Sequence, residues 1–100
     1  MVDDILREMQ SRATTLRSLN ASVRFVLGKN GEVIRVDARA TPISITQDDE
    51  ESDCTIRISP ENLVKLMDGR LNPMLAFTLG KLKIEGSMGI AMKLAQLLDE

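Results

Sequence analysis

The last third of the chain, residues 66–98, constrains the fold more than any other stretch, because it carries two helix signals and a strand signal in a fixed order. Asn72-Pro73 is typical of an N-cap followed by a first helical residue, and Gly80 stands where a left-handed residue would end that helix. Residues 81–85 alternate charged and aliphatic side chains, which predicts a strand with one buried face. Gly86-Ser87 then turns the chain into a last helix.

This last helix, from Met88 to Leu98, is more apolar than packing on a single layer requires. On a helical wheel its apolar side chains sweep roughly 220°, and a helix packed on one layer needs about half of that arc. These side chains are Leu97, Ile90, Leu94, Leu98, Ala91, Ala95, Met88 and Met92. The excess predicts that the helix meets another chain or lines a cavity filled by something apolar. A fully buried C-terminal helix is the plainer alternative.

The first part of the chain predicts one long helix and four strands. Residues 2–19 place apolar side chains three and four apart, as in an amphipathic helix. Alternating runs at 23–27 and 34–38 flank Asn30-Gly31, which is a strong hairpin signal. Alternation returns in a short strand at 43–45 and again at 54–58.

A further helix is predicted between Ser59-Pro60 and Gly69, with Leu63, Leu66 and Met67 as its buried stripe. Strands with one apolar face and tight turns favour an antiparallel sheet, whose apolar face helices must cover. We therefore expect residues 1–100 to form a single two-layer α+β domain. Its sheet would be five-stranded and mainly antiparallel, with the last strand joined by a crossover and the helices enclosing an apolar cavity.

Composition excludes several classes of function. A net charge of −2 and the absence of Trp and Tyr argue against nucleic-acid binding. No apolar run approaches the roughly 18 residues of a membrane span. The start Met1-Val2-Asp3-Asp4 carries acidic residues where a signal peptide is basic. The single cysteine favours a reducing compartment, and the C-terminal residues are not a peroxisomal signal. We expect a cytoplasmic protein.

Catalysis and metal binding are also disfavoured. The chain has no histidine, so the commonest general base near neutral pH is missing. Cys54 shares the parity of Ile56 and Ile58, which places it in the core as an inert side chain. The acidic run 47–53 lacks the spacing of a calcium loop and is typical of a solvated turn. We expect no catalytic residue, metal or cofactor.

Three motifs in the last third resemble a known family. They are N-P-x-x-A-F at 72–77, G-K-L-K-I at 80–84 and G-x-M-G-x-A-M-K-L at 86–94. In this order and spacing they look like the signature half of the sterol carrier protein (type two, nonspecific lipid-transfer) domain family. Residues 53–56 and the helix at 62–68 also fit that family, whereas the first half is similar only in its pattern of strands.

The resemblance implies a small domain whose sheet and helices enclose an apolar tunnel for fatty acyl chains, acyl esters or sterols. In that case the lipid-binding residues are expected to be Met67, Met74, Phe77, Leu79, Met88, Ala91, Met92 and Ala95. On the last helix, the alanines and methionines would face the cavity and the branched side chains the sheet. Glutamine is common in the family at the positions of Met74 and Leu79, so we expect acyl or prenyl chains rather than sterols, whose hydroxyl would lack partners.

Two functions remain open. The first is an intracellular lipid carrier, with an apolar lipid as its partner and transient contact with membranes. The second is a non-catalytic accessory module that docks through its apolar C-terminal helix on another protein or an identical chain, for example in lipid or quinone biosynthesis. The sequence leaves the natural ligand and the oligomeric state undetermined.

Overall fold

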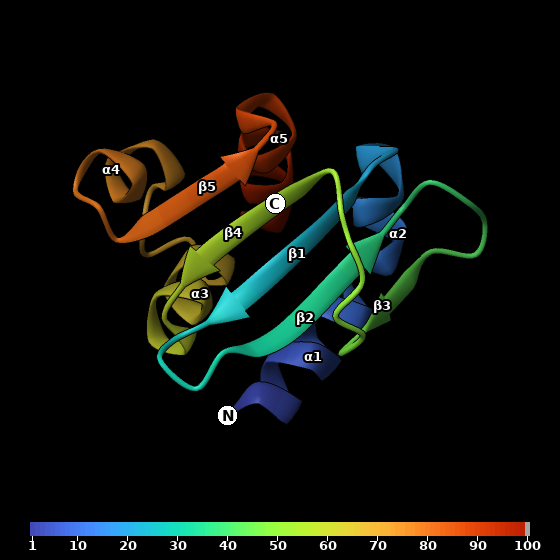
Figure 1. The fold of residues 1–100 in the computed structure, drawn as a ribbon, viewed down its shortest axis with the longest axis horizontal. Helices are drawn as coiled ribbons and strands as arrows, with labels where there is room; N and C mark the ends of the chain where they lie inside the picture. Colours follow the sequence, from blue (N-terminus) through green and yellow to red (C-terminus); the bar gives the residue numbers. More distant parts are fainter. Residues whose placement is uncertain (100) are drawn as a thin grey trace.

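A five-stranded sheet forms the front layer of the computed structural model, which describes residues 1–99 (Figure 1). Its strands are β1 (Ser22–Leu27), β2 (Glu32–Asp37), β3 (Ser44–Thr46), β4 (Cys54–Ile58) and β5 (Leu82–Gly86). They lie in the order β3-β2-β1-β4-β5. The β1–β4 pair is parallel and the other three pairs are antiparallel, which confirms the predicted mainly antiparallel sheet.

The helices lie behind this sheet and form the second layer, with α4 placed beside the edge strand β5 (Figure 1). They are α1 (Val2–Ser11), α2 (Ala13–Leu16), the 3₁₀ helix η1 (Arg17–Leu19), α3 (Pro60–Met67), α4 (Pro73–Thr78) and α5 (Met88–Leu98). The core between the layers is built from Phe25 and Ile56 of the sheet and from Leu63 and Leu94 of the helices, among others. The predicted two-layer α+β fold is confirmed.

The helix starts follow the local sequence signals. The side-chain oxygen of Ser59 accepts a hydrogen bond from the Asn62 amide at 3.1 Å, and that of Asn72 accepts one from the Leu75 amide at 3.0 Å. Each of these caps satisfies an amide that has no partner within its helix. Proline occupies the first helical position after both caps, as predicted.

The single N-terminal helix predicted over residues 2–19 is wrong, because the helix breaks at Arg12. The Arg12 guanidinium donates to the backbone carbonyls of Met67, at 3.0 Å, and Leu98, and it also pairs with Glu8. These carbonyls belong to the ends of α3 and α5, where helices leave carbonyls unpaired. Contacts with distant parts of the chain therefore determine where the helix breaks between α1 and α2.

The carboxylates of the acidic run are exposed, as predicted, but the run is a connection across the sheet rather than a turn. Residues 47–53, hereafter the crossing segment, run in front of β2 and β1 and carry the chain from β3 to β4 (Figure 1). The buried Arg35 of β2 donates to Ser52 Oγ at 2.9 Å and to the Glu51 carbonyl at 3.0 Å, and Arg24 pairs with Asp49 at 2.6 Å. The segment thus covers part of the sheet face that the helices leave open.

The crossover predicted before the last strand lies instead between β3 and β4. β5 lies antiparallel to β4, the strand that precedes it in the chain. The parallel neighbours are β1 and β4, so the connection that must pass over the sheet is the crossing segment between β3 and β4. Strand alternation alone does not show which strands are neighbours, and for this reason the sequence did not place the crossover.

The carboxylates of the crossing segment are expected to contribute little to stability. Replacing Asp48, Asp49, Glu50 and Glu51 together by Ser or Asn should lower the free energy of unfolding by less than about 1 kcal/mol. The bonds of Arg35 to Ser52 Oγ and to a backbone carbonyl remain possible in this variant. Urea unfolding measures the change, with Arg35→Met as the control that removes those bonds. A saturable thermal shift with micromolar calcium, lost in the variant, would instead reveal a metal site.

Candidate functional site

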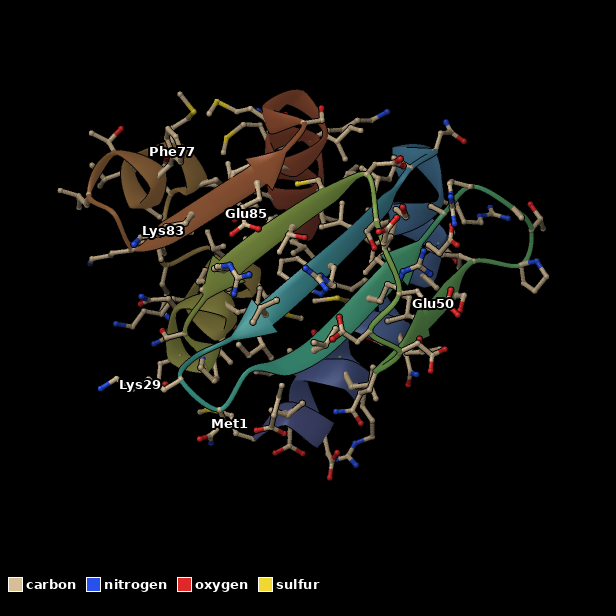
Figure 2. The ribbon with its side chains drawn as sticks, viewed as in Figure 1. Met1, Lys29, Glu50, Phe77, Lys83 and Glu85 are labelled. Carbon is tan, nitrogen blue, oxygen red and sulfur yellow. The ribbon has the colours of Figure 1, made fainter. Side chains whose placement is uncertain are left out.

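Five of the eight predicted lipid-binding residues lie on α4 and α5 without being fully buried. Met74 on α4 and Leu79 at its end are exposed, and Phe77 is half-buried. Met88 and Met92 belong to the first half of α5, and sulfur atoms lie between α4 and the start of α5 in Figure 2. The structure therefore gathers most of the predicted site on one side of the molecule.

A small cleft runs between the start of α4 and the second half of α5. It has a volume of about 160 Å³, and its lining contains Asn72, Pro73, Met74, Met92, Gln96 and Asp99. Pockets that enclose small molecules usually have about 300–1,000 Å³. A long acyl chain would therefore need α4 and α5 to move apart, or would have to extend over the neighbouring apolar surface.

Along α5, the structure does not separate the small side chains from the branched ones as we predicted. Ala91 and Ala95 are buried together with Leu94 and Leu98, and these four positions form one stripe with helical spacing. α5 contacts β4 and β5 as well as α2, α3 and α4, so its buried arc follows the geometry of several neighbours. Ala95 is buried but lies outside the contiguous core cluster.

Met67 lies apart from the other predicted residues. It lines a second cavity of about 580 Å³ between α1 and α3, together with Met1, Asp4, Ile5, Glu8, Val64 and Asp68. A third cavity, of about 590 Å³, lies between the N-terminus and the tip of the β1–β2 hairpin, and its lining includes Val2, Lys29, Glu32 and Glu61. Neither cavity includes a residue of α4 or α5.

Comparison with known proteins decides the family. Residues 2–99 match the model of the SCP-2 sterol transfer family. The chain belongs to this family. The match covers nearly the whole chain, so the family includes the N-terminal half, which resembled it only in its strand pattern. The chain is hereafter called the SCP-2 domain.

The relatives of this SCP-2 domain agree in sequence and fold. Sterol carrier protein 2 of Oryctolagus cuniculus is 55% identical over 49 residues, which are 49% of this chain and 9% of that protein. The chain thus spans about a tenth of the length of this curated relative. The solution structure of the sterol carrier protein domain 2 of Helicoverpa armigera is 35% identical, with a TM-score of 0.71 over 95% of this chain and 80% of that chain. Palmitated SCP2L2 of Aedes aegypti shares the fold at 20% identity and a TM-score of 0.61, over 80% of this chain and 73% of that one.

The perturbed titratable groups of the SCP-2 domain lie outside the α4–α5 cleft. Burial, with a smaller effect of Asp53, raises the pKa of Cys54 to about 11, which keeps the buried thiol protonated and agrees with its predicted place in the core. A hydrogen bond from Arg57 at 2.6 Å lowers the pKa of Glu85, and one from Arg39 lowers that of Asp37. The two carboxylate shifts reflect pairing with arginine side chains.

Within residues 1–99 no group of three or more His, Cys, Asp or Glu side chains is arranged to hold a metal ion. Across the same residues, every helix is too short or too polar to traverse a bilayer. Sequence reasoning missed three polar residues of the cleft, Asn72, Gln96 and Asp99. Gln96 follows Met92 by four positions, so helical spacing could have placed the two on one face.

Proposed function

We propose that this SCP-2 domain binds a long apolar lipid, such as a fatty acyl chain, between α4, β5 and α5. It would carry the lipid between membranes that it contacts transiently. The observation that carries the proposal is the cleft that Met74 and Met92 share. Leu79 at the end of α4 and Met88 at the start of α5 add exposed apolar side chains on the same two helices. Methionine side chains are flexible and polarisable, so they adapt to ligands of different shape. The proposed role is binding rather than catalysis.

The attachment of α4 supports its movement as the site fills. This helix has six residues and packs on the domain mainly through Pro73 and Ala76, which are buried. Its connection to β5 passes through Gly80, whose φ of +74° favours glycine. A lipid chain entering beneath α4 would bury apolar side chains, and each fully buried one contributes about 1.5–3 kcal/mol. That gain would offset the loss of the few contacts between α4 and α5.

The apolar side chains of Met74 and Leu79 favour an acyl chain over a sterol. The polar lining residues Asn72, Gln96 and Asp99 are exposed, so they are available to a head group at the surface. Met74 and Leu79 offer no hydrogen bond to a buried hydroxyl, whose burial without a partner costs about 1–3 kcal/mol. An acyl chain needs no such partner along its length, and its carboxylate can remain at the surface near Lys93 of α5, which is exposed. The palmitated relative from Aedes aegypti supports this class of ligand.

A thermal-shift titration tests the proposed binding. Delipidated protein is titrated with palmitate, an acyl-CoA, a sterol and a quinone with a prenyl tail. Ligand at a hundredfold excess over its dissociation constant should raise the melting temperature by about 10 °C. Palmitate and the acyl-CoA are expected to give the largest shifts. No shift with any of these compounds would overturn the proposal.

Tryptophan reporters locate the bound lipid, because the chain contains no tryptophan of its own. Met74→Trp places the reporter in the α4–α5 cleft, and Val64→Trp and Glu61→Trp place matched controls in the two larger cavities. Palmitate should shift the emission of Met74→Trp to shorter wavelength and leave the other two unchanged. A shift confined to Val64→Trp would move the site to the cavity between α1 and α3.

Native mass spectrometry distinguishes the carrier from the accessory module. A carrier should copurify with one lipid per chain, whereas a module that docks through α5 should appear as an empty, stable dimer or hetero-complex. The exposed Met88 at the start of α5 is common to both functions. Lipid occupancy therefore decides between them.

A further inference from the structure

The outward side of α4 is apolar, although it faces solvent. Met74, Leu75 and Leu79, which together form the α4 face, are 59%, 53% and 58% exposed. Met74 also lines the cleft with α5, so the face adjoins that cleft. The opposite side of the helix holds the buried Pro73 and Ala76. Single exposed apolar residues are ordinary, but a cluster of large ones on one short helix is typical of an interaction surface.

Basic residues border the α4 face. Lys81 and Lys83 are exposed on and just before β5, and the backbone amide of Lys81 donates to the Ala76 carbonyl at 2.8 Å, which holds it beside the end of α4. Figure 2 shows Lys83 pointing outward on the same side of the molecule as α4. Because β5 is an edge strand, the lysines and the α4 face can meet one flat surface together.

The charge of this part of the chain differs in sign from that of the whole. Residues 69–98 contain four basic side chains and one carboxylate, a net charge of +3, whereas the complete chain has −2. The one carboxylate, Glu85, already accepts a hydrogen bond from Arg57 at 2.6 Å. Two further carboxylates adjoin this stretch: Asp68, which pairs with Arg70 at 2.8 Å, and Asp99, which lies in the cleft with Met74. The border of the α4 face is therefore positive on its β5 side, through Lys81 and Lys83, and this side complements an anionic surface.

These features fit a lipid bilayer better than a protein. Protein interfaces are enriched in aromatic residues, methionine and arginine and depleted in lysine. Their binding energy is concentrated in tryptophan, tyrosine and arginine, whereas leucine is under-represented among these anchors. The α4 face offers methionine and leucine, and its border offers lysine. Apolar side chains that enter the headgroup boundary, beside lysines that face lipid phosphates, are the two components of peripheral membrane binding.

We infer that the SCP-2 domain docks on anionic membranes through the α4 face, with Leu75 and its neighbours entering the interface and Lys81 and Lys83 facing the phosphates. The inference rests on the proposed function in that a lipid carrier must meet its donor and acceptor membranes. In this orientation, the helix that covers the cleft is also the helix that touches the bilayer. A lipid could then pass between bilayer and cleft without crossing water.

Co-sedimentation with vesicles tests the inference on the full chain. Wild type should bind vesicles of phosphatidylcholine with phosphatidylserine more tightly than vesicles of phosphatidylcholine alone, and added salt should weaken this preference. Reversing both charges in Lys81→Glu/Lys83→Glu should reduce binding to anionic vesicles at least about tenfold. The matched control, Lys29→Glu/Lys65→Glu, makes the same change in net charge at exposed sites away from α4 and should change binding less than about twofold. Leu75→Ser should weaken binding to both kinds of vesicle.

Three outcomes would overturn the inference. Equal losses of vesicle binding in the two double variants would show that anionic vesicles attract only the overall charge of the protein. Unchanged binding by Leu75→Ser would show that α4 does not enter the bilayer, and dissociation of a dimer by this variant would assign the face to a protein contact. The palmitate-induced thermal shift, measured in the same variants without vesicles, separates the two proposals. If the thermal shift persists but the variants do not differ in vesicle binding as expected, only the docking inference is wrong. If the variants differ as expected but palmitate gives no thermal shift, only the proposed ligand is wrong.

Discussion

Gly86→Ala is expected to lower the free energy of unfolding by about 2–5 kcal/mol, as the sum of a backbone and a steric effect. Gly86 ends β5 with a φ of +93°, a conformation that side chains with a Cβ rarely adopt. A Cβ at this position would lie 2.7 Å from the Asp53 carbonyl oxygen and 3.3 Å from the Cys54 Cα. Both neighbours are backbone atoms, so a rotamer change cannot relieve the contact.

The backbone of Asp53 is held in place by Ser22. The Asp53 amide donates to Ser22 Oγ at 3.0 Å, and the Asp53 carboxylate accepts from the Ser22 amide at 2.9 Å. Cys54 pairs in the sheet with Val23 on one side and with Gly86 on the other. Relief of the clash would require β4 and β5 to separate at this end, which is why we expect a large effect.

Gly80→Ala is the matched control, because Gly80 has a similar φ of +74° but no atom within 4 Å of an added Cβ. It should cost about 1–2 kcal/mol from the backbone alone. Urea unfolding followed by circular dichroism measures both variants. If Gly86→Ala and Gly80→Ala lose the same free energy of unfolding, the close approach of β5 to Asp53 does not constrain the fold.

Leu94→Ala is expected to destabilise the domain by about 2–5 kcal/mol. Leu94 is fully buried in the middle of α5, within the core formed with the sheet. Its truncation removes apolar contacts and leaves a cavity that the neighbouring residues fill only in part. Since α5 also borders the proposed lipid site, the thermal response to palmitate should be measured in the same variant.

The same substitution on α4 serves as the control, since Leu75 is 53% exposed. Leu75→Ala should change the free energy of unfolding by no more than about 0.5 kcal/mol. Both variants remove the same atoms from a helix, so the difference between them isolates burial. A loss below about 1 kcal/mol for Leu94→Ala would contradict the described packing of α5 on the sheet.

Elements specified by neighbouring residues could be predicted from the sequence. The caps at Ser59 and Asn72 and the hairpin at Asn30-Gly31 each depend on a few adjacent residues, and the structure contains all three. Alternation of side chains correctly placed Cys54 in the core. The motifs of the last third identified the family because they combine such local signals at fixed spacing.

Features that depend on distant contacts could not be predicted. Arg12 breaks the N-terminal helix where it reaches carbonyls of α3 and α5, and Arg35 is buried because the crossing segment covers it. In the candidate site, Ala91 and Ala95 are buried because α5 has neighbours on several sides. Helical spacing shows that side chains share a face, but which neighbour that face meets depends on the whole fold.

The crossing segment also bears on the order in which the domain folds. Pairing of β1 with β2 closes a turn of four residues, whereas Asp53 meets Ser22 across a separation of 31 residues. Loop closure costs more entropy as the loop lengthens, so the hairpin is expected to form first and β4 to join it later. β5 adds to β4, and α5 packs on both strands, so the half of the chain that carries the proposed lipid site is expected to assemble on a sheet that has already accepted β4. When the full chain refolds, its most apolar helix would therefore be covered last, and a lipid present at that stage could be enclosed as the domain closes.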